Sequence, residues 1–244
     1  VESILVYQGQ VKGIKVQGTE LTFDKVLSGA DYHHTETLLP AAYRQYSERY
    51  WSKRTFAPSS LLFYVGFDKK IEHVEHHTLF FDVPFEKHAQ SIYDHPQWPE
   101  EPLFYASFPS KTDDSAAPKG KEAGIFLIPL AVGIEDSPEL RETYFEKIMI
   151  RFENLTGQSV KKNVIFKESF CLNDFINDYN SYKGNAYGLA NTLMQTAFLR
   201  PKLKSKKVDG LFFTGQLTVP GPGVPPSLIS GKIVSGLMDQ SIKS

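Results

Sequence analysis

The residues best suited to chemistry form a run rich in proline and glycine near the C-terminus, VPGPGVPP at residues 219–226. A strand is predicted before it, at 208–215, and a helix after it, at 227–240. Such a helix presents backbone N–H groups and the positive end of its dipole to the space ahead of it. Because Gly221 and Gly223 have no side chain, a flat ligand can approach the backbone there. The run suits a phosphate or a flavin ring. A crossover that only stiffens the fold is an equal alternative.

Other groups of reactive side chains have a less specific pattern. Residues 72–77 hold three histidines and two glutamates, but they occupy a polar turn and no fourth ligand is recognisable, so no metal site is predicted. Asp113 and Asp114 lie in a polar loop, which argues against paired-carboxylate catalysis. Cys171 has no recognisable base beside it and fits a small buried residue. The sequence therefore leaves the catalytic residues unassigned.

The N-terminal part predicts β structure that ends in a turn of small residues. Strands are expected at 3–6 and 11–16, on either side of a turn at 8–10. A short apolar strand at 25–27 ends in Ser-Gly-Ala-Asp at 28–31, where small side chains let the backbone approach a neighbour closely. A helix is expected from Pro40 to about residue 50, because its tyrosines fall on one face.

The middle of the chain alternates strands with helices, which favours an antiparallel sheet carrying helices on one side. Strands are expected at 60–67, 78–82, 103–108, 124–131 and 160–167, and helices at 85–93, 138–155 and 174–179. The helix at 138–155 has the clearest ends: Ser137 as N-cap, Pro138 in the first turn and Gly157 after the last. Its buried stripe is expected to be Leu140, Tyr144, Ile148, Phe152 and Leu155.

Composition limits the classes of partner. The net charge of -1 argues against general binding of nucleic acid. One basic cluster, RPKLKSKK at 200–207, is either a solvated loop or a contact for anionic lipid. The single cysteine suits a reducing compartment, and no apolar run approaches the roughly 20 residues of a membrane span. The 18 Phe and 12 Tyr fit sheet cores first and an apolar ligand cavity second.

Two stretches resemble the bacterial-type phytoene desaturases, a family of FAD-dependent carotenoid desaturases. Residues 184–238 are similar to the family's C-terminal signature, in which a strand ends in glycine and a Pro-Gly-x-Gly-x-Pro turn opens a helix against the flavin. Residues 23–35, FDKVLSGADYHHT, resemble the family's strand that ends in small residues, Asp and His. Segments 47–70 and 101–113 resemble its middle region, so the likeness covers essentially the whole chain.

The resemblance implies which residues contact the flavin. They are Asp31, Gly215, Pro220, Gly221, Gly223, Val224 and Pro225. His33 and His34 match the family pattern, with packing or hydrogen bonding as their expected role and a catalytic role as the alternative. The family's GxGxxG turn, which holds the FAD pyrophosphate, is not found here, because residues 9–13 lack the spacing. The chain also opens directly on a predicted strand, so we expect it to be the C-terminal part of a longer enzyme, inactive alone.

The implied fold is a mixed α/β one: a partial Rossmann-like FAD domain of the glutathione-reductase or amine-oxidase type, with a substrate domain built on an antiparallel sheet. Residues 1–32 and 196–244 would belong to the FAD domain, and residues 33–195 to the substrate domain. The implied activity is oxidoreduction: hydrogen leaves C–C bonds of a C40 isoprenoid by hydride transfer to FAD. A carotenoid isomerase or later-step desaturase is the alternative within the superfamily, and a non-enzymatic module that binds an apolar ligand is the alternative outside it.

The same resemblance implies the partners and the location. The partners are the carotenoid substrate, the N-terminal FAD-binding half, a membrane surface and, as a possibility, a second copy of the enzyme. Because the substrate lies in the bilayer, the enzyme would be cytoplasmic and peripherally attached to the inner membrane.

Overall fold

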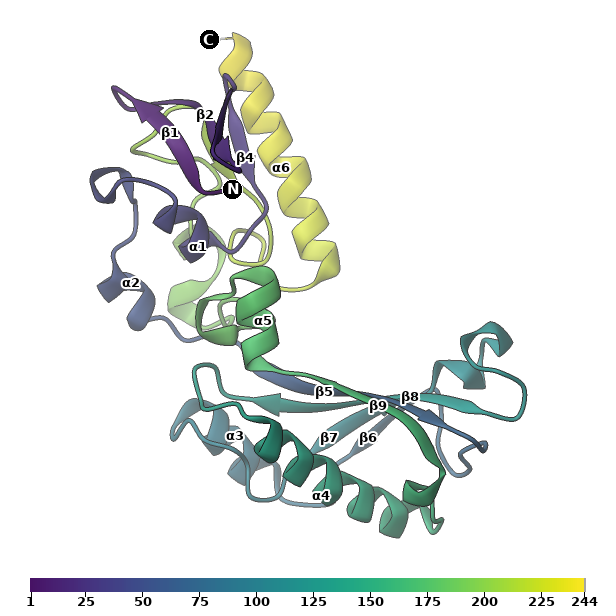
Figure 1. Ribbon diagram of the computed structural model, residues 1–244. Coiled ribbons are helices and arrows are strands. Elements are labelled where there is room, and N and C mark those ends of the chain that lie inside the picture. The colour runs from purple at the N-terminus through teal and green to yellow at the C-terminus, as the bar shows by residue number, and fades with distance from the viewer. Residues whose placement is uncertain (244) are drawn as a thin grey trace. The chain divides into compact units, whose positions relative to one another are not determined.

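The computed structural model describes residues 1–243, and the chain divides into two compact units (Figure 1). Unit 1 joins Val1–Ala57 to the segment that begins at Ile176, and unit 2 is Pro58–Phe175. Unit 2 is therefore inserted between the two segments of unit 1. The functional boundaries expected after residues 32 and 195 remain predictions, because they concern ligand contacts and these units concern compactness. Both units mix strands with helices, as the expected fold class requires.

Unit 1 begins with a three-stranded antiparallel sheet. Its strands are β1 (Ser3–Tyr7), β2 (Gln10–Val16) and β3 (Thr19–Thr22), in that order. The expected hairpin around residues 8–10 is confirmed, with Tyr7 paired to Gln10. Strand β3 was not expected, because all four of its residues are exposed and carry no buried apolar pattern.

A parallel pair of short strands forms the second layer of unit 1. Strand β4 (Val26–Ser28) pairs with β10 (Leu211–Phe213), and all three residues of β10 are buried. Helix α6 (Val224–Lys243) packs on β10 through a cluster of Leu203, Phe212 and Val234. The helix begins three residues before the expected Ser227, because prolines are tolerated in a first turn, whose N–H groups have no partner in the helix.

The helix expected from Pro40 to residue 50 was wrong. The region instead contains α1 (Tyr32–Thr37), a 3-10 turn (Ala41–Tyr43) and α2 (Glu48–Ser52). The buried carboxylate of Glu36 accepts the backbone N–H groups of Gln45 and Tyr46, at 2.6 and 3.1 Å. Because these two N–H groups bond Glu36, they cannot form the backbone hydrogen bonds of a helix, and the backbone of Arg44 is extended.

Unit 2 is built on a five-stranded sheet in which every pairing is antiparallel, as expected. The strand order is β6 (His77–Phe80), β7 (Phe104–Ser107), β8 (Glu122–Leu130), β5 (Ser59–Phe67) and β9 (Val164–Phe170). Strand β9 begins later than expected, because residues 161–163 form a 3-10 turn. Helix α3 (Phe85–Tyr93) follows β6, and α5 (Leu172–Tyr179) follows β9.

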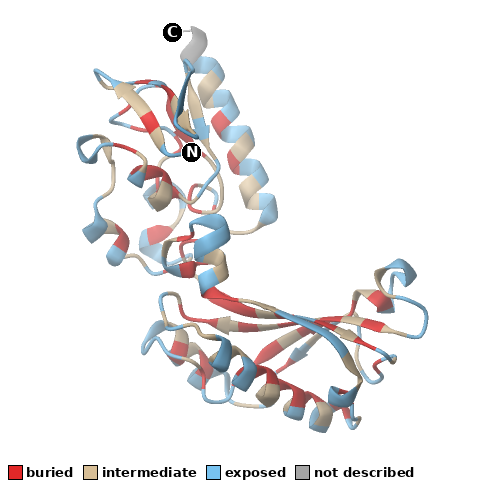
Figure 2. Ribbon diagram, in the orientation of Figure 1, coloured by how far each residue is buried: buried red, intermediate tan, exposed pale blue. Residues whose placement is uncertain are grey.

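Helix α4 (Pro138–Thr156) covers one face of this sheet (Figure 1). Both expected ends are confirmed: the Ser137 hydroxyl accepts the N–H of Leu140 at 3.3 Å, and Gly157 is left-handed with a φ of 67°. Figure 2 shows the buried residues of unit 2 along the strands and on α4. Phe152 packs edge-on against Phe126 of β8, with 5.3 Å between ring centroids. Of the expected stripe, Leu155 is exposed and the next residue, Thr156, is buried instead.

No helix of the described part of the chain combines the length and the apolar character that a membrane span requires.

Candidate functional site

The turn between β10 and α6 has a backbone that only glycine adopts readily. Gly215, Gly221 and Gly223 have φ angles of 102°, 139° and 108°, in the region that L side chains disfavour. A β-carbon on Gly215 would meet no atom within 4 Å, so the chain leaves open space beside the end of the strand. The predicted Pro-Gly turn is thus a shaped loop with one accessible side.

Arg200 holds this turn by hydrogen bonds to its backbone carbonyls. Its side chain is buried, and its guanidinium donates five hydrogen bonds. Nε bonds the carbonyl of Thr218 at 2.9 Å, and Nη2 bonds the carbonyls of Gln216 at 3.0 Å and Leu189 at 3.2 Å. Nη1 bonds the carbonyl of Gln195 and the side-chain oxygen of Asn191, at 3.1 and 3.0 Å. All five N–H groups of the guanidinium are therefore in use.

The charge of Arg200 has no acidic partner among the described residues. Four of its acceptors are backbone carbonyls and the fifth is an amide. Burial lowers the pKa of Arg200, but a guanidinium stays protonated in proteins. Carbonyl dipoles compensate this buried cation, so the positions of those carbonyls are tied to it.

Helix α6 is attached to the same turn through Ser230. The Ser230 hydroxyl accepts the N–H of Gly215 at 2.8 Å and donates to the carbonyl of Ser227 at 2.7 Å. Pro225 and Pro226 have no N–H, so the start of α6 carries fewer free donors than an ordinary helix. The N–H of Ser227 bonds the carbonyl of Gly223. The helix therefore offers mainly its dipole and the N–H groups of Gly223 and Val224.

Asp31 lies at the N-terminus of α1, where its carboxylate accepts three hydrogen bonds. Oδ1 caps the helix by accepting the N–H of His34 at 3.2 Å. Oδ2 accepts the N–H of Tyr182 and the side-chain amide of Asn185, both at 3.2 Å. All three donors to the Asp31 carboxylate thus come from the chain itself, and a contact between Asp31 and a cofactor remains a prediction.

A chain of hydrogen bonds connects Asp31 to the turn. Asn185 is fully buried, and its Oδ1 accepts the N–H of Gly188 at 3.0 Å and the side-chain amide of Gln216 at 3.5 Å. The carbonyl of Gln216 is one of the acceptors of Arg200. The structure therefore brings together the two predicted groups of site residues, Asp31 and the run 215–225, through residues that the sequence did not single out.

An aromatic cluster supports β10 from the side of α1. The ring of Tyr32 stacks on Phe213 with 3.9 Å between centroids, and it also contacts Tyr46 and Trp51. Burial is the largest influence on the carboxyl of Glu36 and raises its pKa, against the lowering effect of hydrogen bonds from Gln45, Tyr46 and Trp51. This cluster fixes the end of the strand that leads into the turn.

The remaining candidates from the sequence have local partners. His33 lies 3.0 Å from both carboxylate oxygens of Glu48 and packs against Trp51 and Tyr182. His77 bonds the hydroxyl of Tyr105 at 2.5 Å. Asp113 caps a 3-10 turn by accepting the N–H of Ser115. Within the described residues, no three histidine, cysteine or carboxylate side chains gather as a metal site requires. Cys171 is buried, which raises its pKa to about 12.

The residues of the turn fit one edge of a flat ring that can carry negative charge better than they fit a diphosphate. Gly215 leaves open space beside the end of β10, and the N-terminal end of the α6 dipole and the buried cation of Arg200 lie near the backbone of the turn. A diphosphate needs several free N–H groups, and the prolines of α6 remove two of them. The turn therefore suits the flavin ring, not the pyrophosphate.

Unit 2 has an apolar row on the face of its sheet opposite α4. Strand register aligns five side chains, one on each strand. In order they are Leu79, Tyr105, Leu127, Leu62 and Phe170. With strands about 4.8 Å apart, the row extends for about 19 Å. At its β6 end lies an apolar pocket of about 200 Å³, which Leu79 and Tyr105 line together with Ala89 and Ile92 of α3.

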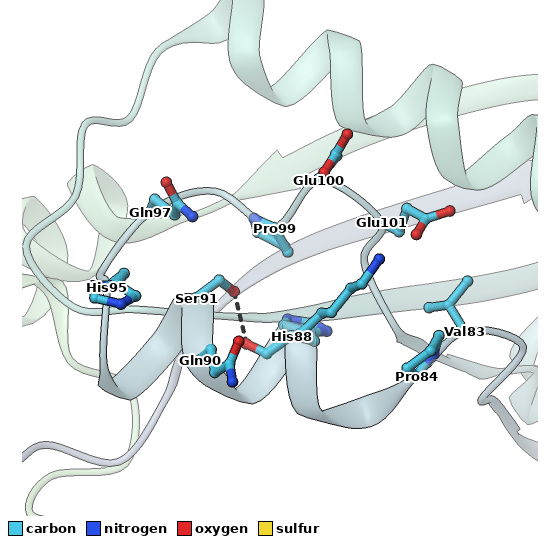
Figure 3. A pocket seen from close by; sticks show the side chains of 11 residues that line it. Val83, Pro84, His88, Gln90, Ser91, His95, Gln97, Pro99, Glu100 and Glu101 are labelled. Atoms are coloured by element: carbon cyan, nitrogen blue, oxygen red, sulfur yellow. Dashed lines mark hydrogen bonds between the residues drawn. The ribbon is translucent and has the colours of Figure 1, made fainter.

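A second hollow on α3 is polar (Figure 3). His88 lies at its base, with Nδ1 accepting the N–H of Leu103 at 2.9 Å and Nε2 facing the carbonyl of Pro129 at 2.8 Å. This pair of partners requires the neutral ring with its hydrogen on Nε2. The hydroxyl of Ser91 donates to the carbonyl of His88 within the helix (Figure 3). His88 thus joins α3 to the sheet and is not free for proton transfer.

The fold is similar to that of solved structures. A solved structure of an oxidoreductase from Methanosarcina mazei matches 98% of this chain and 48% of its own length, with a TM-score of 0.55 and 14% identity. At that identity the likeness establishes the mixed α/β fold. No protein-family model matches the chain.

Sequence relatives define the family within that fold. A carotenoid 3,4-desaturase of Haloarcula japonica is 44% identical over 218 residues, which are 89% of this chain and 44% of the relative. A zeta-carotene-forming phytoene desaturase of Myxococcus xanthus is 29% identical over 96% of this chain and 46% of the relative. The chain therefore belongs to the carotenoid desaturase family. It spans about half the length of the curated relatives that it matches.

Proposed function

We propose that the chain is the C-terminal part of an FAD-dependent desaturase that removes hydrogen from C–C bonds of a carotenoid. The observation that carries the proposal is the turn at 215–223, which has three glycines with positive φ, open space beside Gly215, and Arg200 bonded to its carbonyls. The relatedness to desaturases over most of the chain supports it. When bound, FAD would supply the hydride acceptor.

In this proposal the turn positions the flavin ring, and the residues are those expected from the sequence. Gly215 would let the ring approach the backbone, and Gly221 and Gly223 would allow the tight turn beside Arg200. Pro220, Val224 and Pro225 would hold the entry to α6. The dipole of α6 and the charge of Arg200 would favour negative charge on the ring. Asp31 would act from the neighbouring strand end through Asn185 and Gln216.

The substrate would lie along unit 2. A carotenoid has no polar handle, so its recognition depends on apolar surface. The row of Leu79, Tyr105, Leu127, Leu62 and Phe170, with the pocket at its end, offers such a surface. Aromatic rings such as Tyr105 can stabilise positive charge that develops when a hydride leaves an allylic carbon.

The remaining partners follow from the same proposal. The pyrophosphate of FAD would be held by the N-terminal half of the enzyme, because the turn here has too few donors for it. The substrate dissolves in lipid, so the enzyme would work at the cytoplasmic surface of the membrane. A homo-oligomer is compatible with this arrangement.

A flavin absorbance measurement tests the proposal. The chain is purified alone and as a fusion with the part of the Haloarcula japonica relative that it does not match. We expect no tight FAD binding by the chain alone and stoichiometric FAD in the fusion. A yellow chain without any added segment would contradict the assignment of the pyrophosphate site. A fusion that folds but stays colourless would contradict the flavin proposal itself.

The reaction has a second candidate, a later desaturation step. It is favoured by the relative of higher identity, which is named for 3,4-desaturation, whereas the Myxococcus xanthus relative is named for phytoene. To distinguish the two reactions, the fusion is expressed in cells that accumulate phytoene and in cells that accumulate lycopene. The pigments are then resolved by chromatography. Isomerised but not desaturated product would indicate an isomerase. Bound but unchanged pigment would indicate a binding module.

A further inference from the structure

The most exposed apolar side chains of the chain lie beside its basic cluster. Leu193 and Phe198 are 88% and 77% exposed, the highest values for large apolar residues in the described part of the chain, and Met194 is 68% exposed. They lie on two 3-10 turns, Leu193–Gln195 and Ala197–Leu199. Water-exposed side chains of this size on one short segment are typical of a surface that binds something apolar.

The segment that presents them is anchored at Gln195 and at Arg200. Gln195 is buried, and its side chain makes a pair of hydrogen bonds with the backbone of Thr55, at 2.7 and 3.0 Å. Arg200 bonds the carbonyl of Gln195 at 3.1 Å. Phe198 lies between these anchors, and Leu193 and Met194 directly precede the first of them, so a defined backbone holds all three side chains outward.

The lysines that follow face outward as well. From residue 201 to 206 burial alternates: Pro201, Leu203 and Ser205 are buried, while Lys204 and Lys206 are exposed. A groove of about 410 Å³ brings Phe198 together with Lys202, Lys204 and Lys206. Phe198 and these lysines thus line one groove, and Leu193 and Met194 precede Phe198 on the same short segment. We call residues 193–207 the basic-apolar patch.

The charge of the patch is of one sign. No acidic residue occurs between Asp178 and Asp209, and Asp209 pairs with Lys204 at 3.2 Å. The whole chain has a net charge of -1, so the positive charge is concentrated here. Lysines around exposed Leu, Met and Phe side chains match an anionic bilayer, in which apolar groups enter the acyl region and ammonium groups contact phosphate.

We propose that the basic-apolar patch is the surface by which the protein docks on an anionic lipid bilayer. The inference rests on the proposed function for its purpose, since a bilayer-dissolved substrate must be reached from the membrane surface. Its physical basis is independent: exposed apolar groups, a defined backbone and positive charge. Loss of lipid contact would leave the flavin turn intact, because Arg200 faces inward from the same segment.

Co-sedimentation with lipid vesicles tests the patch, using the fusion and the chain alone. We expect binding to vesicles of phosphatidylglycerol and phosphatidylcholine in equal parts, weaker binding to pure phosphatidylcholine, and release at high salt. Replacing Lys204, Lys206 and Lys207 with Gln should weaken binding on the order of a hundredfold, since each lysine near an anionic surface contributes about fivefold. Leu193→Ser with Phe198→Ser should weaken it at least about tenfold.

Matched controls keep the result specific. Lys12→Gln, Lys15→Gln and Lys119→Gln remove the same charge outside the patch, and Tyr7→Ser removes an aromatic ring that is 63% exposed. Circular dichroism checks that every variant is folded. Equal vesicle binding by patch variants and controls would overturn the proposal. Patch variants that bind vesicles normally but lose FAD would identify an interdomain contact instead. Vesicle binding in a fusion that stays colourless would retain the patch and reject the flavin proposal.

Discussion

Gly221 lies against the guanidinium of Arg200: a β-carbon at position 221 would stand 3.6 Å from Arg200 Cζ and 3.4 Å from Asn191 Oδ1. The cation and the turn therefore fix each other. Arg200 needs the carbonyls of Gln216 and Thr218 where they are, and the turn can place them there only with glycine at 221.

Gly221→Ala should destabilise unit 1 by about 1 to 3 kcal/mol, because the φ of 139° is strained for any L side chain. The measurement is urea unfolding followed by circular dichroism. Gly236→Ala is the matched control, since Gly236 lies in α6 with open space around its β-carbon position, and it should stabilise by about 0.5 to 1 kcal/mol. Equal effects of the two substitutions would show that the turn is not shaped as described.

Arg200→Met should cost roughly 3 kcal/mol, because buried carbonyl oxygens would lose their donors. Arg200→Lys should recover only part of this, since an ammonium cannot reach five acceptors. Thermal unfolding of both variants beside Arg49→Met, an exposed arginine of α2, measures the difference. A loss of stability no larger than that of Arg49→Met would contradict the role of Arg200 in holding the turn.

Asp31→Asn should destabilise unit 1 by about 1 to 2 kcal/mol, because the new amide group would face donors from Tyr182 and Asn185. Asp24→Asn is the control, an exposed carboxyl with no such partners. Both variants are compared in chemical unfolding and, in the fusion, in FAD content. Unchanged stability with lost FAD would assign Asp31 to the cofactor alone.

The stability of unit 2 should fall in mild acid because of His88. Burial lowers the pKa of this ring from 6.5, so below that value the unfolded chain binds a proton that the folded chain excludes. The unfolding free energy should therefore decrease from about pH 7 to about pH 5. His88→Gln keeps one donor and one acceptor without titrating and should flatten this part of the pH profile.

His95→Gln, on the exposed side of the same hollow, should leave the profile as it is (Figure 3). If His88→Gln retained the full acid sensitivity, another group would have to be its origin.

The elements with strong local signals were predicted from the sequence, and those that depend on distant partners were not. Helix α4 is marked by Ser137, Pro138 and Gly157, all of which act within a few residues. The helix predicted after Pro40 does not form, because Glu36 accepts the N–H groups of Gln45 and Tyr46. No local sequence pattern indicates this contact.

The site was predicted at the level of the turn but not of its support. Gly215, Gly221 and Gly223 were recognisable by type and spacing, whereas Arg200 lay hidden in a run of lysines. Pro201, Leu203 and Ser205 alternate with lysines, which is the period of an extended segment with one buried face. That alternation places residue 200 on the side of the lysines, so the burial of Arg200 depends on its distant carbonyl partners and not on a local pattern.

The parallel pairing of β4 with β10 sets an order of events during synthesis. About 180 residues separate Ser28 from Leu211, and unit 2 lies entirely between them. At about 5 to 20 residues per second, β4 leaves the ribosome about 10 to 40 s before its partner strand. Unit 2 can complete its five-stranded sheet in that interval, while the unpaired edge of β4 remains open to wrong partners. The turn at 215–223, which follows β10 directly, thus forms only after the whole of unit 2 has been synthesised.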